Sequence, residues 1–235
     1  MQEALLHFRR SEDPDTLWKA EVAALKRHGA ERLLALRPPP GDIGRDCDIR
    51  SEGFPLSFVS QYVEEELWRH DPAVRAATNR FRPFCRAELG DSLPLSPQEE
   101  RFAELCRDYD LGKGVIIPVF GPRGSNGFVE VVTAEDCGDS TPENIYEMQT
   151  IAQMAHQRYC ELKGFGEAQP PQLSDRENQI LFWVAQGKSN RSIAGILDIS
   201  ANTVDTYLRR IYEKLDVTDR TRAAIRGIAY GLIRP

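Results

Sequence analysis

Hydrophobic and polar positions divide the chain into two regions with different patterns. Before residue 164, helical segments with apolar residues every three or four positions alternate with short apolar runs that predict strands. Two such runs in 114–136 flank a Gly/Pro/Asn-rich turn, which predicts a β-hairpin. Long helices are expected at 96–112 and 141–164. This mixture indicates an α+β domain, an α/β/α sandwich around a mainly antiparallel sheet.

A Gly- and Pro-rich stretch predicts the boundary to a second domain. We expect one domain at 1–163, a linker at 164–172 and a second domain at 173–235, because consecutive prolines forbid continuation of a helix. The second domain is expected to be all-α, with four helices separated by short turns. Its third helix carries one apolar stripe, made of Val204, Leu208, Ile211 and Leu215. This is the helix-turn-helix pattern, whose second helix enters the major groove of DNA.

Charge is distributed unevenly between these regions. From residue 169 onward there are ten basic and seven acidic residues, hence +3, and the remainder carries −9 of the total net charge of −6. A small basic domain attached to an acidic body is expected when only one domain meets a polyanion.

The outer face of the third helix is polar and carries two arginines. Arginine reads guanine, and threonine or a helix N-terminus holds phosphates. An ordinary solvated face with an i,i+4 pair between Asp205 and Arg209 explains the same residues. The residues alone leave both interpretations open.

The segment 173–233 resembles the DNA-binding domain of LuxR-type transcriptional regulators. Matching positions are Leu173, Glu177, Leu181, Gly187, Lys188, Ile193, Ala194, Leu197, Ser200, Thr203, Val204, Leu208, Ile211, Lys214 and Leu215. The resemblance implies that a homodimer binds a two-fold symmetric site on double-stranded DNA. It implies DNA contacts from Lys188, Asn202, Thr203, Asp205, Thr206, Arg209 and Arg210, with Arg209 foremost. The family often has a basic residue where Asp205 stands.

The last helix resembles the family's dimerisation helix. Ala223, Ala224 and Gly227 are small enough for two copies to approach closely, or for that helix to pack on its own domain.

The segment 15–163 resembles the acyl-homoserine-lactone-binding domain of quorum-sensing regulators. The motifs are FPLSFVSQYVEEELWRHDPAV, LGKGVIIPV and GSNGFVEVV, with Tyr62, Asp71, Pro72 and Gly114 at family landmarks. The resemblance implies that the Tyr62 hydroxyl and the Asp71 carboxylate meet the amide of a signal molecule. Without it, an Asp followed by Pro is better explained as a helix cap.

Phe58 and Arg86 depart from this pattern, because the family prefers tryptophan at both positions. Phenylalanine has no hydrogen-bond donor to offer a lactone. Trp68, Val74 and Phe102 are expected as pocket wall or core.

Glu130 is a third departure, at a position where the family often has Ser or Thr. Strand alternation puts Glu130 on one face with Phe128 and Val132. A buried carboxylate needs a partner. Three alternatives stay open: Arg86 pairs with Glu130 and fills the pocket, one or both meet a charged ligand, or the strand register turns Glu130 to solvent.

The sequence therefore predicts a quorum-sensing-type transcription regulator with the atypical pocket of a solo receptor. Its signal is expected to be an acyl-homoserine lactone or a related non-lactone amide. The alternative is a ligand-independent regulator whose pocket is plugged by Arg86 and Glu130.

We expect no enzyme, metal site or cofactor other than the signal, because His, Cys and Ser form no ligand or nucleophile motif. The five cysteines are expected as reduced thiols. No apolar run suits a membrane span, and a cytoplasmic location without a membrane partner is expected.

Overall fold

A computed structural model describes residues 2–40, 47–89, 96–109, 114–134, 141–166 and 171–234. The chain forms two compact units, residues 1–166 and 167–235, and each is described by itself. Residues 167–170 of the expected linker lie outside the described part of the chain. No helix of the described residues has the length and apolar character needed to cross a membrane.

The first unit is built on a five-stranded sheet with strand order β2-β1-β5-β4-β3. The strands are β1 (Ala30–Arg37), β2 (Asp48–Glu52), β3 (Phe84–Cys85), β4 (Val115–Val119) and β5 (Gly127–Thr133). Each paired strand runs antiparallel to its neighbour. β4 and β5 form the hairpin that the sequence predicts, and β5 lies at the centre of the sheet.

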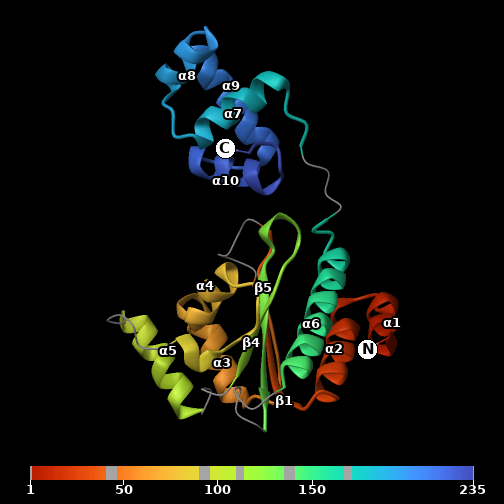
Figure 1. Ribbon diagram of the computed structural model, residues 1–235. Coiled ribbons are helices and arrows are strands. Elements are labelled where there is room, and N and C mark those ends of the chain that lie inside the picture. The colour runs from red at the N-terminus through yellow and green to blue at the C-terminus, as the bar shows by residue number, and fades with distance from the viewer. Residues whose placement is uncertain are drawn as a thin grey trace. The chain divides into compact units, whose positions relative to one another are not determined.

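Helices cover both faces of this sheet, as Figure 1 shows. On one face lie α1 (Gln2–Arg10), α2 (Pro14–Lys26) and α6 (Pro142–Leu162). On the other lie α3 (Leu56–Glu64), α4 (Pro72–Asn79) and α5 (Pro97–Asp108), with the short 3-10 helices η1 (Leu67–His70) and η2 (Arg86–Leu89). A third 3-10 turn, η3 (Pro122–Gly124), joins β4 to β5. The α/β/α sandwich with an antiparallel sheet is confirmed.

The side chains of β5 alternate between two separate cores. Val129 and Val131 face the core under α2 and α6, whereas Phe128 and Val132 face the core under α3, α4 and α5. The Glu130 side chain lies on the same face as Phe128 and Val132 and is 2% exposed. The expected alternation is therefore confirmed, and the alternative in which Glu130 faces solvent is wrong.

The second unit contains α7 (Asp175–Ala185), α8 (Asn190–Leu197), α9 (Ala201–Leu215) and α10 (Arg220–Ala229). Ser174 and Glu177 form a capping box at the start of α7, and Ser200 caps α9. Between α8 and α9 the chain turns at Asp198, which has a left-handed backbone with φ 52°. The predicted stripe of α9 is buried throughout: Val204, Leu208, Ile211 and Leu215. The all-α helix-turn-helix domain is confirmed.

The cysteines depart in part from the expectation of reduced thiols. Cys47, Cys106 and Cys160 are free, but Cys85 at the end of β3 is disulfide-bonded, so the expectation is wrong at that position.

A buried ion pair crosses the core under α2 and α6. Arg37 at the end of β1 donates from Nη2 to Glu21 Oε2 of α2 at 2.5 Å, and both side chains are almost fully buried. The guanidinium lies 5.0 Å from the centroid of the Tyr159 ring. Burial raises the pKa of Glu21, although Arg37 opposes this effect. The pair fixes α2 to the end of β1, and removing one partner leaves the other charge buried.

We expect Glu21→Leu to lower the free energy of unfolding of the first unit by about 3–5 kcal/mol, because Arg37 is left buried without a counter-charge. Urea denaturation followed by circular dichroism measures this loss. The matched control is the double variant Glu21→Leu/Arg37→Met, which removes both charges and is expected to recover most of it. Equal destabilisation in the single and double variants would contradict this account.

Candidate functional site

Arg86 lies at the centre of a buried polar cluster on the α3/α4/α5 face of the sheet. Its Nε donates to Glu130 Oε1 at 2.6 Å, and its Nη2 donates to Glu130 Oε2 at 2.7 Å. From the opposite side, its Nη1 and Nη2 donate to the two carboxylate oxygens of Asp71 at 2.9 and 3.1 Å. All three nitrogens of one guanidinium therefore hold two carboxylates, in the fork geometry that suits arginine.

Asp71 caps α4 and also takes part in the buried cluster, whereas its contact with a signal amide stays a prediction. Its Oδ1 accepts the backbone N–H of Ala73 at 2.8 Å, which caps the first turn of α4. Its Oδ2 accepts the hydroxyl of Tyr62 at 3.0 Å. Asp71 is therefore a helix cap and a member of the buried cluster at once.

Aromatic side chains enclose this cluster. Tyr62 stacks on Phe58 with ring centroids 5.5 Å apart, and Phe102 lies 6.0 Å from Tyr62. The guanidinium of Arg86 lies 5.7 Å from the Phe102 ring. Tyr109, which the sequence analysis did not single out, contacts Phe58 edge-on and donates from its hydroxyl to Ser57.

The sequence of β5 explains why Glu130 is buried. Its cross-strand neighbours are Leu34 on β1 and Ile116 on β4, which are both fully buried. A carboxylate between two aliphatic side chains is costly unless it is paired, and Arg86 provides that pair.

Gly114 makes room for Glu130. A Cβ at position 114 would lie 2.9 Å from Cγ and 3.0 Å from Cδ of Glu130 and would collide with its Oε1. The Gly114 carbonyl also accepts the backbone N–H of Arg86 at 2.8 Å. The landmark glycine thus positions both members of the ion pair.

Burial and charge act together on the ionisable groups. Burial raises the pKa of Tyr62 well above its usual value, and the Asp71 carboxylate raises it further, so the phenol remains a donor. Burial acts to lower the pKa of Arg86, but Asp71 and Glu130 outweigh it and hold that pKa well above its usual range. The guanidinium is therefore permanently charged.

The remaining predicted pocket residues, Trp68 and Val74, lie in the same core. Trp68 is buried in η1, and Val74 is half-buried in α4. The structure thus brings Phe58, Tyr62, Asp71, Arg86, Phe102 and Glu130 into one cluster and places Trp68 and Val74 as flanking core.

The second candidate surface is the outer face of α9. Asn202, Asp205, Thr206, Arg209 and Arg210 are exposed, and Thr203 is half-exposed because its hydroxyl meets that of the capping Ser200 at 2.8 Å. Thr206 donates to the backbone of its own helix. Arg210 lies 5.9 Å from the Tyr207 ring. Arg209 has no hydrogen bond or ion pair with another described residue, so its guanidinium is available to a partner.

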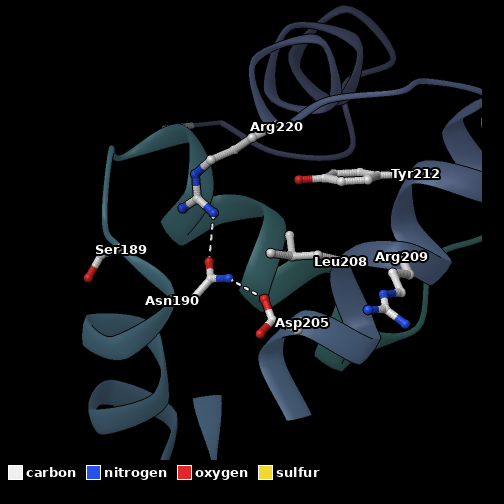
Figure 2. Close-up of a pocket in the computed structure, with 7 residues that line it drawn as sticks. All are labelled: Ser189, Asn190, Asp205, Leu208, Arg209, Tyr212 and Arg220. Atoms are coloured by element: carbon white, nitrogen blue, oxygen red, sulfur yellow. Dashed lines mark hydrogen bonds between the residues drawn. The ribbon is translucent and has the colours of Figure 1, made fainter. Parts of the chain in front are cut away.

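Asp205 does not pair with Arg209, contrary to the i,i+4 alternative. Its Oδ1 instead accepts from Nδ2 of Asn190, at the start of α8, at 2.5 Å. Asn190 Oδ1 in turn accepts from Arg220 at 2.8 Å, as Figure 2 shows. Sequence reasoning missed Asn190 and Arg220, since nothing in local spacing joins positions 15 and 30 residues apart. The Lys188 carbonyl accepts from Arg220, and the Lys188 side chain is exposed.

A buried Cys–His contact in α6 resembles a nucleophile pair but is not activated. Cys160 Sγ lies 3.5 Å from His156 Nε2, which is 2.7 Å from the Ser125 carbonyl. Burial and Arg37 lower the pKa of His156 to about 4, so the neutral ring donates its Nε2–H to that carbonyl and cannot accept the thiol proton there. Burial also raises the pKa of Cys160.

Comparisons with known proteins match each unit of the chain to a family. Residues 13–159 match the autoinducer binding domain, and residues 171–226 match the bacterial regulatory proteins of the luxR family. Two relatives are the transcriptional activator BjaR1 of Bradyrhizobium diazoefficiens and the quorum sensing-dependent regulator RpaR of Rhodopseudomonas palustris. BjaR1 is 25% identical, with 94% of this chain and 90% of BjaR1 covered. RpaR is 29% identical, with 78% of this chain and 74% of RpaR covered.

The crystal structure of Escherichia coli SdiA has the same fold. Its TM-score is 0.66 at 24% identity, with 100% of this chain and 98% of SdiA covered. An SdiA structure in complex with octanoyl-rac-glycerol gives a TM-score of 0.65 at 20% identity, with 98% of this chain and 94% of that chain covered.

An autoinducer binding domain that spans most of the first unit, followed by a helix-turn-helix unit of matching type, assigns this chain to the LuxR family of bacterial quorum-sensing transcriptional regulators.

Proposed function

We propose that this regulator binds a two-fold symmetric DNA site as a homodimer, and that its N-terminal unit folds without a bound signal because Arg86 occupies the amide clamp. The observation that carries the proposal is the double fork of Arg86 on Asp71 and Glu130. As a bacterial DNA-binding regulator, it is proposed to act in the cytoplasm, where the chromosome lies.

The amide clamp is satisfied from within the protein. The groups that a signal amide would meet are the Tyr62 hydroxyl and the Asp71 carboxylate. Here the hydroxyl donates to Asp71, and both oxygens of Asp71 accept from Arg86. A signal would have to displace a charged, buried donor and replace its hydrogen bonds, which costs more than filling an empty pocket.

Control by a small signal is the second candidate, and the match to the autoinducer binding domain favours it. An acyl-homoserine lactone or a related amide meets Tyr62 and Asp71 if Arg86 withdraws toward Glu130. Because Phe58 has no donor for a lactone carbonyl, a non-lactone amide fits this clamp equally well.

Solubility with and without a signal separates these candidates. The native protein is expected to be soluble without added signal. Arg86→Met leaves two buried carboxylates unpaired and is expected to cost about 3–5 kcal/mol, which removes the chain from the soluble fraction. Arg86→Trp/Glu130→Ser restores the family pattern and is expected to become soluble only when an acyl-homoserine lactone is supplied. Soluble yield with and without the lactone is the measurement.

Arg82→Met is the control for this experiment, because it removes the same charge from an exposed position nearby. Native mass spectrometry checks that the purified wild type carries no acyl amide. A wild type that is recovered only with added signal, or that holds an amide at full occupancy, would overturn the signal-independent proposal and support the second candidate.

Arg209 is expected to make the main base contact of α9. Arg209→Ala is expected to weaken binding to the specific DNA site by about tenfold or more, because a bidentate contact to guanine contributes about 1–3 kcal/mol. Its thermal melt should be unchanged, since the side chain has no partner among the described residues. Fluorescence anisotropy with Arg82→Ala as the charge-matched control measures the effect. Equal affinity of the Arg209 variant and the control would contradict the recognition-helix assignment.

Dimerisation of the second unit is proposed to use the exposed apolar face of α10. The small residues that the sequence suggested for this contact pack on their own domain instead. Ala223 is fully buried, and a Cβ at Gly227 would lie 2.7 Å from Leu181 Cδ2. Ile225 and Ile228, three residues apart on one face, are 50% and 47% exposed and are available to a second copy.

Ile225→Asp/Ile228→Asp is therefore expected to weaken binding to a two-fold site at least tenfold while leaving affinity for a single half-site unchanged. The physical reason is that a carboxylate cannot be buried at an apolar contact without a partner. Anisotropy titrations on full and half sites measure both affinities. Ile196→Asp, on an exposed position of α8, is the matched control. An equal loss on both DNA lengths would indicate damage to the domain rather than to the dimer.

A further inference from the structure

A hydrogen-bonded chain links three helices of the DNA-binding unit at the surface of α9. Arg220, at the start of α10, donates to Asn190 Oδ1 and to the Lys188 carbonyl. Asn190, at the start of α8, donates from Nδ2 to Asp205 Oδ1 on α9. Figure 2 shows these side chains converging on one pocket, beside Arg209.

The donor-to-acceptor direction of these hydrogen bonds determines which kind of side chain position 205 must carry. Arginine has donors only, so it faces the oxygen of the Asn190 amide and turns the NH₂ group toward position 205. Position 205 must then carry an acceptor. A lysine or arginine there would present donors to a donor, so Asp205, Asn190 and Arg220 form a set.

Asp205 retains one carboxylate oxygen without a hydrogen bond from the described residues. Its partner is a neutral amide rather than a cation, and Oδ2 has no hydrogen bond from any described residue. The residue is exposed on the polar face that also carries Arg209. The structure therefore holds a fixed carboxylate next to a free guanidinium on the recognition helix.

A carboxylate discriminates strongly among base edges in the major groove. A carboxylate only accepts hydrogen bonds. Cytosine is the base whose major-groove edge offers a donor, N4, and no acceptor. Adenine N6 lies beside the acceptor N7, and guanine and thymine offer acceptors alone. A carboxylate that meets no donor is repelled by those acceptors and by the phosphates, so wrong sequences are penalised.

We propose that Asp205, oriented by Asn190 and Arg220, accepts a hydrogen bond from cytosine N4 and so adds a cytosine to each half-site, near the guanine read by Arg209. The two residues are four positions apart, and the axial rise of about 6 Å corresponds to roughly two base pairs. The proposal rests on the proposed function, because it requires α9 to lie in the major groove.

The test is a selection of binding sites by the full-length protein from DNA with randomised half-sites, repeated with variants. The wild type is expected to select a guanine that Arg209→Ala no longer selects, with a cytosine within about two base pairs. Asp205→Ala is expected to lose the cytosine preference by about tenfold while retaining the guanine. Asp205→Asn still accepts from Asn190 and is expected to prefer adenine, whose N6 and N7 an amide contacts bidentately.

Glu213→Ala, which removes the same charge two turns further along α9, is the control and should keep the cytosine preference. Uniform weakening of all sites by Asp205→Ala, or an Arg209-dependent guanine without a neighbouring cytosine, would overturn this inference alone. A wild type that selects no sequence at all would overturn the proposed function and this inference with it.

Discussion

The interaction on which the first unit depends is the double salt bridge of Arg86. It joins the start of α4 through Asp71, the central strand β5 through Glu130 and, by way of Asp71, helix α3 through Tyr62. Three charges out of water cost several kcal/mol each, and their mutual attraction compensates only with good geometry and complete hydrogen bonding. The same elements that would enclose a signal are therefore held by bonds of the protein itself.

Such a cluster is not the cheapest way to fill a core, because well-packed apolar side chains are often as stable as a buried ion pair or more so. What the charges add is specificity of arrangement. An arginine with two carboxylates requires both at fixed angles, so the helix layer has one register against the sheet. In this chain the polar cluster lies where the family pattern has a tryptophan and a serine or threonine. The physical difference is that side chains of the protein itself already fill this part of the interior.

Local pattern predicted part of this cluster. Alternation along β5 placed Glu130 beside Phe128 and Val132, whereas Arg86 was indicated as a partner by its pocket position in the family resemblance, as one of three alternatives. The choice between cap and clamp for Asp71 was not resolvable, because it depends on where a third element brings its side chain. Asp205 shows the same limit: the local rule predicted Arg209 as partner, but Asn190 and Arg220 arrive through tertiary packing.

Two of the departures from the family pattern, at Arg86 and at Asp205, follow one rule. Arg86 comes with Glu130, and Asp205 comes with an Asn190 amide whose orientation Arg220 fixes. In each case a changed charge or polarity is accepted because a residue far away in sequence supplies the complement. Gly114 belongs to the first set, because any side chain there would displace the Glu130 carboxylate. A single reversion toward the family pattern leaves a donor or a charge unmatched, so the members of each set are informative about function only when they are interpreted together.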